Sequence, residues 1–159
     1  MLLYHGSNVV VHKPILLRSD RKLDFGSGFY VTSSFDQAKR WADLTAKRSG
    51  KGAGCVTVYE FDEIAARNLC ILEFKNPSVQ WLLFVSANRK GTSEPDQYDI
   101  VIGPVANDRT MPVISLYFAG IYDEDEAIKR LLPQKLKDQY AFKTQEALSA
   151  LAYKEVISI

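Results

Sequence analysis

The sequence predicts an α+β fold in a single domain that spans residues 1–159. Segments with the period of a strand and segments with the period of a helix follow one another without the regular strand–helix–strand repeat of a doubly wound sheet. The chain has 159 residues, 47% of them hydrophobic and 25% charged, which is the make-up of an ordinary globular domain with its own core. No internal repeat, low-complexity tract or linker interrupts it.

The N-terminal part of the chain predicts two short strands. Residues 2–4 are apolar and precede His-Gly-Ser, so they indicate a strand that runs into a turn. Residues 19–23 are charged and are expected to be exposed. A loop with two glycines follows at 24–28, and the aromatic and β-branched residues 29–32 after it favour a strand.

A helix and two further strands are predicted next. Ser34 is a good N-cap for a helix over residues 36–46, which is expected to stop near Ser49–Gly50. Residues 55–61 alternate in the manner of a strand, and residues 69–73 indicate another one.

The second half of the chain continues the mixture of helices and strands. Helices are predicted at residues 78–88, 123–132 and 144–151, and strands at residues 98–103, 139–142 and 153–159. Residues 113–119 are compatible with either a strand or a helix, because a short apolar run fits both periods. Loops are expected at residues 90–97 and 104–112.

Charge and composition narrow the classes of function. The net charge is +1, so the chain has no overall attraction to nucleic acids or membranes, although a local basic face would suffice for either. Cys55 and Cys70 lack metal-ligand spacing and are expected to be isolated thiols; with only His5 and His12 besides, no metal site is expected. No signal peptide or membrane span is recognisable, so a cytoplasmic location is expected.

Two short motifs carry groups that can bind a planar ligand. In the segment Tyr4–Ser7, a histidine at a strand end precedes a glycine that lets a ligand approach the backbone closely. In the segment Gly28–Thr32, Tyr30 lies 11 residues before Trp41 on the helix that follows. A strand–turn–helix unit can turn these two rings into facing walls that stack a planar heterocycle. Taken alone, each motif also fits a simple turn or core packing.

These two motifs, in this order, resemble the ADP-ribosyltransferase superfamily, in its diphtheria-toxin-like and poly(ADP-ribose)-polymerase-like branch. That branch opens with aromatic-His-Gly-Ser/Thr and continues with Gly-apolar-Tyr-x-Ser/Thr and a helix that carries a second aromatic residue. Tyr4–Ser7, Gly28–Thr32 and Trp41 match these features in turn. This resemblance covers mainly residues 3–41.

The chain also resembles an uncharacterised bacterial family placed in this superfamily. The matching segments are Leu23–Tyr30, Gly103–Asp108 and Asp138–Tyr140. This second resemblance covers nearly the whole chain. Together the two resemblances imply an ADP-ribosyltransferase-like split β-sheet with flanking helices and a pocket that takes NAD as a substrate.

The resemblance implies a role for each matching residue. His5 would hydrogen-bond the adenosine ribose of NAD, and the Gly6 backbone would hold the nicotinamide amide. Tyr30 and Trp41 would sandwich the nicotinamide ring. The residues expected to bind NAD are therefore His5, Gly6, Ser7, Gly28, Tyr30 and Trp41.

The third family position is normally a glutamate at the start of a late strand. In this chain Gln139 stands there and completes the expected catalytic set with His5 and Tyr30. A glutamine can still hydrogen-bond a ribose hydroxyl, but it cannot supply a negative charge opposite a developing cation. The departure argues against chain elongation and leaves mono-ADP-ribosyl transfer open. Gln139 is alternatively an ordinary polar residue at the beginning of a strand.

The loop after the strand 98–103 offers a further candidate contact with the substrate. Asn107, Asp108 and Arg109 are polar and follow a strand, where binding residues commonly lie. Asp108 can accept a proton from an acceptor nucleophile, and Arg109 can meet a phosphate. An ordinary solvated loop explains these three residues equally well.

The leading hypothesis is a NAD-dependent mono-ADP-ribosyltransferase that modifies a macromolecule, either a protein or a nucleic acid. The resemblance further suggests an intracellular bacterial toxin of a toxin–antitoxin module, with an antitoxin protein as its partner. The alternative is a catalytically degenerate module that binds NAD or ADP-ribose, which the missing glutamate favours. A third interpretation is an interaction protein whose aromatic residues are all core. An RNA 2′-phosphotransferase is less favoured, because only two histidines are present.

Overall fold

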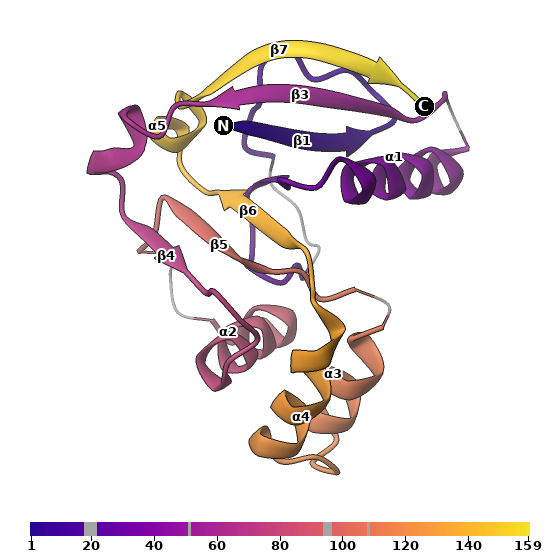
Figure 1. Ribbon diagram of the computed structural model, residues 1–159, viewed down its shortest axis with the longest axis vertical. Helices are drawn as coiled ribbons and strands as arrows, with labels where there is room; N and C mark the ends of the chain where they lie inside the picture. The colour runs from indigo at the N-terminus through magenta and orange to yellow at the C-terminus, as the bar shows by residue number, and fades with distance from the viewer. Residues whose placement is uncertain (18–21, 51, 94–96, 108) are drawn as a thin grey trace.

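The computed structural model describes residues 1–17, 22–50, 52–93, 97–107 and 109–159. The chain has an α+β fold in which two sheets are flanked by helices, as the sequence predicted (Figure 1). None of the described helices has both the length and the apolar character needed to cross a membrane. Cys55 is buried and Cys70 exposed, and both are free thiols.

The upper sheet in Figure 1 has three antiparallel strands. Their order is β1 (Leu2–Ser7), β3 (Cys55–Phe61) and β7 (Leu151–Ser158). The predicted turn after Tyr4 is wrong, because β1 continues through His5 and Gly6, which pair with Thr57 and Val56. Pairing with a strand about fifty residues away in the chain therefore extends β1 beyond its apolar run.

The lower sheet has four strands. Their order is β2 (Phe29–Val31), β6 (Asp138–Phe142), β5 (Ile100–Pro104) and β4 (Ile71–Glu73). Only β4 and β5 run parallel to each other, and the remaining pairs are antiparallel. All of these strands overlap ranges that the sequence predicted, although β4 is shorter than expected.

Helix α1 (Phe35–Ser49) covers β1 and connects β2 with β3. The Ser34 side chain caps its first turn, and Gly50 ends it in the left-handed conformation with φ 61°, so both predicted ends are confirmed. Ala38 and Ala42 form the buried face that lies on Val56 of β3. The small side chains on this face allow the helix to approach the sheet closely.

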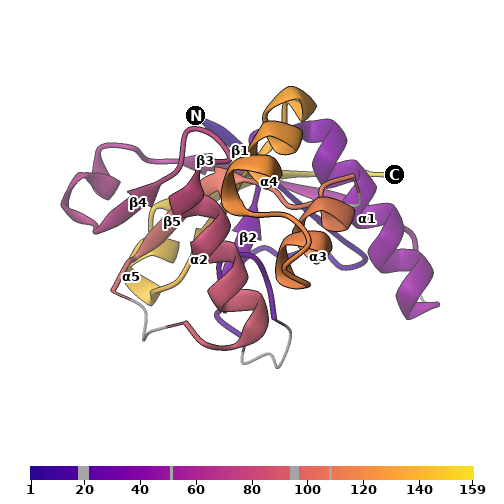
Figure 2. The ribbon, with the colours of Figure 1, turned by 90° about the horizontal axis from the view of Figure 1, so that it is seen from below.

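Three helices lie below the lower sheet in Figure 1, and Figure 2 shows the molecule from their side. They are α2 (Val79–Lys90), α3 (Met111–Phe118) and α4 (Glu124–Leu131). Residues 113–119, which fitted two structures in the sequence, are thus mostly helical, and the predicted loop 104–112 is shorter because α3 begins within it. The last helix, α5 (Gln145–Leu148), is capped by Thr144 as expected but ends early, since Leu151 already belongs to β7. Residues 18–21 lie outside the described residues, so the prediction for 19–23 reaches only Lys22, which is exposed, and Leu23.

Three hydrophobic cores hold these layers together. The first lies between the two sheets and includes Leu3, Phe29, Tyr59 and Phe142. The second lies below the lower sheet, where Phe25, Trp81, Val101 and Ala141 are fully buried. The third is the small contact between α1 and the upper sheet.

In the described part of the chain, one isolated backbone bridge pairs β1 with Thr32, the residue that follows β2. The Tyr4 N–H donates to the Thr32 carbonyl at 2.9 Å, and the Thr32 N–H donates to the Tyr4 carbonyl at 3.0 Å. Beyond this bridge the two strands separate, so the fold has the split sheet that the family resemblance implied. We call the place where they part, bounded by Tyr4–Gly6 and Tyr30–Thr32, the strand fork.

Candidate functional site

At the strand fork, the edge of Gly6 that faces away from β3 has no partner strand among the described residues. In an antiparallel ladder the N–H and C=O groups of alternate residues point to the same side. Because Tyr4 directs both groups to Thr32, Gly6 directs its N–H and C=O to the same edge, away from β3. Continued pairing would place Tyr30 opposite Gly6, but no described residue is hydrogen-bonded to the Gly6 groups at this edge. One donor and one acceptor therefore lie side by side there.

Gly6 is also a point of close approach between α1 and the upper sheet. A Cβ atom on Gly6 would lie 1.8 Å from the carbonyl oxygen of Ala38 and 2.8 Å from the nitrogen of Ala42. Only glycine allows this contact between a strand and a helix backbone. The same contact brings the helix that carries Trp41 against the strand fork.

The imidazole of His5 closes one side of the strand fork. Its Nδ1 lies 2.8 Å from the carbonyl oxygen of Tyr30, and because a carbonyl only accepts, Nδ1 carries the proton and Nε2 is an acceptor. The ring stacks on Phe29 with the centroids 4.5 Å apart. Burial lowers the pKa of His5, more than the hydrogen bond to Tyr30 raises it, which favours the neutral ring.

The side chain of Tyr30 is fixed by hydrogen bonds at its hydroxyl. The hydroxyl donates to the Gly26 carbonyl at 2.7 Å and accepts the Phe25 N–H at 3.1 Å. The ring is half-buried and packs against the second core, below the lower sheet. Trp41 is partly exposed on α1 and belongs to none of the three cores. The sandwich of Tyr30 and Trp41 around a ligand stays a prediction.

Gln139 lies in β6 on the same face of the lower sheet as Tyr30. Tyr30 pairs with Ala141, and side chains two residues apart on a strand share a face, so Ala141 and Gln139 point the same way as Tyr30. Its side chain is almost fully buried, with 3% exposed. The Gln139 Nε2 donates to Asp24 Oδ2 at 2.8 Å.

Asp24 connects Gln139 to two other elements. Its Oδ1 accepts from Arg89 Nε at 2.6 Å, at the C-terminal end of α2. Its Oδ2 also accepts the Ala106 N–H at 2.9 Å, just beyond β5. The sequence alone predicted no role for Asp24. No spacing in the sequence signals the pair of Asp24 and Arg89, because its members are 65 residues apart.

Two of the expected ligand residues have local structural roles. Ser7 is buried, and its hydroxyl accepts the Val9 N–H at 3.3 Å in the turn after β1. A Cβ atom on Gly28 would lie 2.9 Å from the carbonyl oxygen of Phe142, so the close approach of β2 to β6 requires glycine there. These contacts account for both residues without a ligand, and their roles toward NAD stay predictions.

The loop after β5 is organised by Asn107. Its Oδ1 accepts the N–H groups of Arg109 at 2.9 Å and Thr110 at 3.3 Å, which starts α3. Arg109 itself is exposed. Asp108 lies outside the described residues, so its predicted role stays a prediction. The sequence therefore underestimated the structural importance of Asn107.

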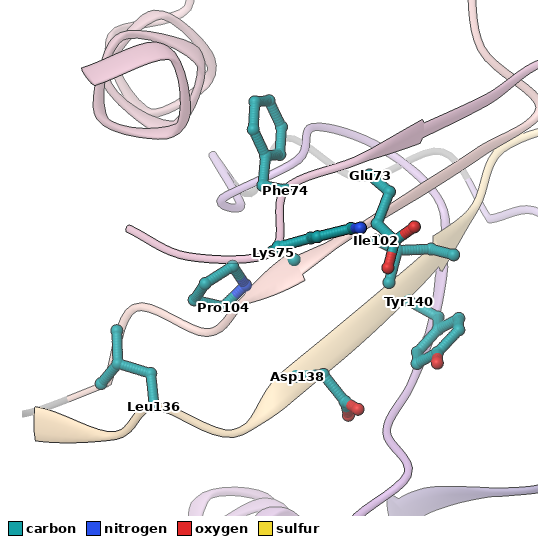
Figure 3. A pocket seen from close by; sticks show the side chains of 9 residues that line it. Glu73, Phe74, Lys75, Ile102, Pro104, Leu136, Asp138 and Tyr140 are labelled. Atoms are coloured by element: carbon teal, nitrogen blue, oxygen red, sulfur yellow. The ribbon is translucent and has the colours of Figure 1, made fainter. Parts of the chain in front are cut away.

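A cavity of about 270 Å³ lies on the other face of the lower sheet (Figure 3). Its lining residues are Glu73, Phe74, Lys75, Ile102, Gly103, Pro104, Leu136, Asp138 and Tyr140. Burial, together with the negative charges of Asp138, Glu73 and Glu63, raises the pKa of Tyr140 to about 12, so its hydroxyl stays protonated. Because Asp138 and Tyr140 alternate with Gln139 on β6, the cavity lies on the face opposite the Gln139 side chain. Asp138 also borders the strand fork, since the Thr32 hydroxyl donates to its carbonyl oxygen at 2.9 Å. The sequence gave no indication of this cavity.

Comparison with known proteins identifies the family of the chain. No curated protein and no solved structure matches it. The sequence model of the DUF3990 family, whose members are described as proteins of unknown function, matches residues 1–153. Because this match covers almost the entire chain, the protein belongs to the DUF3990 family.

Proposed function

We propose that this protein binds NAD at the strand fork and transfers its ADP-ribose group to a macromolecule. The observation that carries the proposal is the unpaired N–H and C=O of Gly6. A primary carboxamide offers an N–H donor and a carbonyl acceptor side by side, so it can pair with Gly6 in the way that a neighbouring strand would. The nicotinamide group of NAD carries such a carboxamide.

The groups around Gly6 suit the remainder of the nicotinamide nucleotide. Tyr30 and Trp41 would stack on the two faces of the nicotinamide ring, as the resemblance implies, and an aromatic ring attracts a cationic pyridinium more strongly than a neutral ring. His5 offers Nε2 as an acceptor for a ribose hydroxyl. Asn107 and Arg109 remain candidates for contact with the acceptor or a phosphate.

In the proposed reaction the bond between nicotinamide and the ribose C1′ breaks, and nicotinamide leaves with the bonding electron pair. A nucleophile of the acceptor, a protein or a nucleic acid, then bonds to C1′ and loses its proton. Gln139 accepts a hydrogen bond from the ribose and holds it in place. Because Gln139 is neutral, it stabilises the cationic transition state less than a glutamate would, which is consistent with a single transfer rather than chain growth.

The biological setting is part of the same proposal. The resemblance to toxins of this superfamily supports action in the bacterial cytoplasm, within a toxin–antitoxin module whose antitoxin protein would be a binding partner. A second candidate function is NAD or ADP-ribose binding without turnover. The neutral side chain of Gln139 is the observation that favours this alternative.

Thermal and chemical unfolding with NAD tests the binding step. A ligand at 100 times its Kd adds ~2.7 kcal/mol to the free energy of unfolding, and we expect NAD to stabilise the wild-type protein in this way. Trp41→Ala should lose the stabilisation, because it removes one of the two rings that would enclose the nicotinamide. Tyr153→Ala, which removes an exposed aromatic side chain on β7, should keep it. No stabilisation of the wild type by NAD contradicts the proposal.

Labelled NAD separates the enzyme from the binding module. We expect nicotinamide release in the presence of cell lysate and label on a macromolecule, with Tyr30→Ala inactive. Sensitivity of the labelled product to protease or to nuclease identifies the acceptor class. NAD binding without release above the Tyr30→Ala level would leave only the binding module.

A further inference from the structure

We infer that Asp24 is a positioning residue that turns the oxygen of Gln139 toward the bound ligand. The inference rests on the proposed function for the identity of that ligand. Asp24 is 5% exposed, and three groups donate to its carboxylate: the guanidinium of Arg89, the Ala106 N–H and the Gln139 amide. A carboxylate held by donors from α2 and from the end of β5 cannot rotate away from β6.

The chemistry of the carboxylate determines which end of the Gln139 amide faces it. A glutamine amide has an NH₂ donor at one end and an oxygen acceptor at the other, whereas an ionised carboxylate only accepts. The flipped amide would set its oxygen against Asp24 Oδ2, where Nε2 now lies at 2.8 Å, and two acceptors at that distance repel each other. The NH₂ group is therefore committed to Asp24.

The opposite end of the amide is left as an acceptor. Among the described residues, none donates a hydrogen bond to Gln139 Oε1, and the side chain keeps 3% of its surface exposed. The negative charge of Asp24 also polarises the amide and strengthens its oxygen as an acceptor. Gln139, held by Asp24, thus offers the ribose an oxygen that accepts a hydrogen bond from a hydroxyl. A carboxylate would offer the same acceptor, but Gln139 does so without a charge at position 139.

The arrangement also accounts for glutamine at this position. A glutamate at 139 would place a second carboxylate within hydrogen-bond distance of Asp24, and two such groups cannot both stay ionised without a large penalty. The single guanidinium of Arg89 pairs with only one of them. The replacement of the family's glutamate by Gln139 and the presence of Asp24 are therefore parts of one arrangement.

The test compares the affinities of NAD and of nicotinamide alone, because nicotinamide lacks the ribose. Asp24→Asn should weaken NAD binding about tenfold, the loss of one hydrogen bond, and leave nicotinamide binding unchanged. Gln139→Ala should act in the same way, and the double variant should bind NAD no more weakly than either single one. Asp99→Asn is the control. Asp99 lies at the other end of β5, and its carboxylate likewise accepts hydrogen bonds, from the Cys70 N–H and from the Thr144 hydroxyl.

Each contrary result has a separate meaning. If the wild type binds NAD and the effects of the two single variants multiply, or Asp24→Asn weakens nicotinamide equally, the inference is overturned and the proposed function stands. If the wild type binds neither molecule, the proposed function fails. The inference is then decided in the free protein by NMR of the Gln139 side-chain amide, whose resonances should move toward those of the exposed Gln80 in Asp24→Asn. Unchanged Gln139 resonances in that variant would overturn it.

Discussion

Gly6 combines two properties that no residue with a side chain can combine. Its backbone faces the strand fork, and its Cα faces the backbone of α1 at a distance that excludes a methyl group. We therefore expect Gly6→Ala to destabilise the fold by about 3 kcal/mol or more, because two backbone segments would have to separate. Urea unfolding measures the loss.

A matched control for this variant is Gly120→Asn. Gly120 has φ 73° and no neighbouring atom within 4 Å of a Cβ atom, and asparagine tolerates this conformation better than other residues. Its stability should change little. Wild-type stability in Gly6→Ala would show that α1 does not press on β1 as described.

His5 links stability to pH. Burial lowers the pKa of His5 from the usual 6.5. Below about pH 6.5, His5 is therefore protonated in the unfolded chain but still neutral in the folded protein. Stability is then complete above about pH 6.5 and falls as the pH drops toward the lowered pKa. We expect the free energy of unfolding to fall between about pH 7 and pH 5, and this part of the fall to disappear in His5→Gln. Identical profiles for wild type and His5→Gln would refute the assignment.

At the scale of elements, α1 depends on its first turn. Ser34 Oγ accepts the Gln37 N–H at 3.4 Å, and Ser34→Ala should cost ~1 kcal/mol of stability. Ser34→Asp should restore most of it, because aspartate is an equally good N-cap with a charge that suits the helix N-terminus. Chemical denaturation of the three proteins checks this order. Equal stability of the alanine and wild-type proteins would mean that the hydroxyl does not cap α1.

Local signals in the sequence predicted the elements whose structure is decided locally. The alternating residues of β3 and the N-caps of α1 and α5 lie within a few residues of the features that they fix. The turn predicted after Tyr4 was wrong because only pairing with β3 makes His5–Ser7 extended. The apolar run in α3 fitted two periods, and burial against α2 and α4 decided it.

The residues of the candidate site likewise differ in whether a local signal in the sequence reveals them. The motifs around Gly6 and Tyr30 could be found because each is a short continuous segment. Asp24 could not, because its partner Gln139 lies 115 residues away and neither residue type is unusual. The cavity beside Tyr140 was also missed, since it is assembled from the ends of three strands.

At the scale of the whole molecule, the strand fork lies where the layers meet. The upper sheet carries α1, the lower sheet carries α2 to α4, and the first core fills the space between the sheets (Figures 1 and 2). The Tyr4–Thr32 backbone bridge and the hydrogen bond from His5 to the Tyr30 carbonyl join the two sheets there. The backbone around the fork is thus supported on both sides, while the edge of Gly6 itself stays open.

An open strand edge is normally a hazard, because it offers a template on which the strand of another chain can add and start aggregation. The single bridge between Tyr4 and Thr32 limits that hazard here. The bridge ends the opening on one side, the His5 ring occupies the Tyr30 carbonyl, and α1 covers the face above Gly6. The part of the β1 edge that remains open is about one peptide unit long. That gap is too short to seed a foreign strand, yet it matches one amide group.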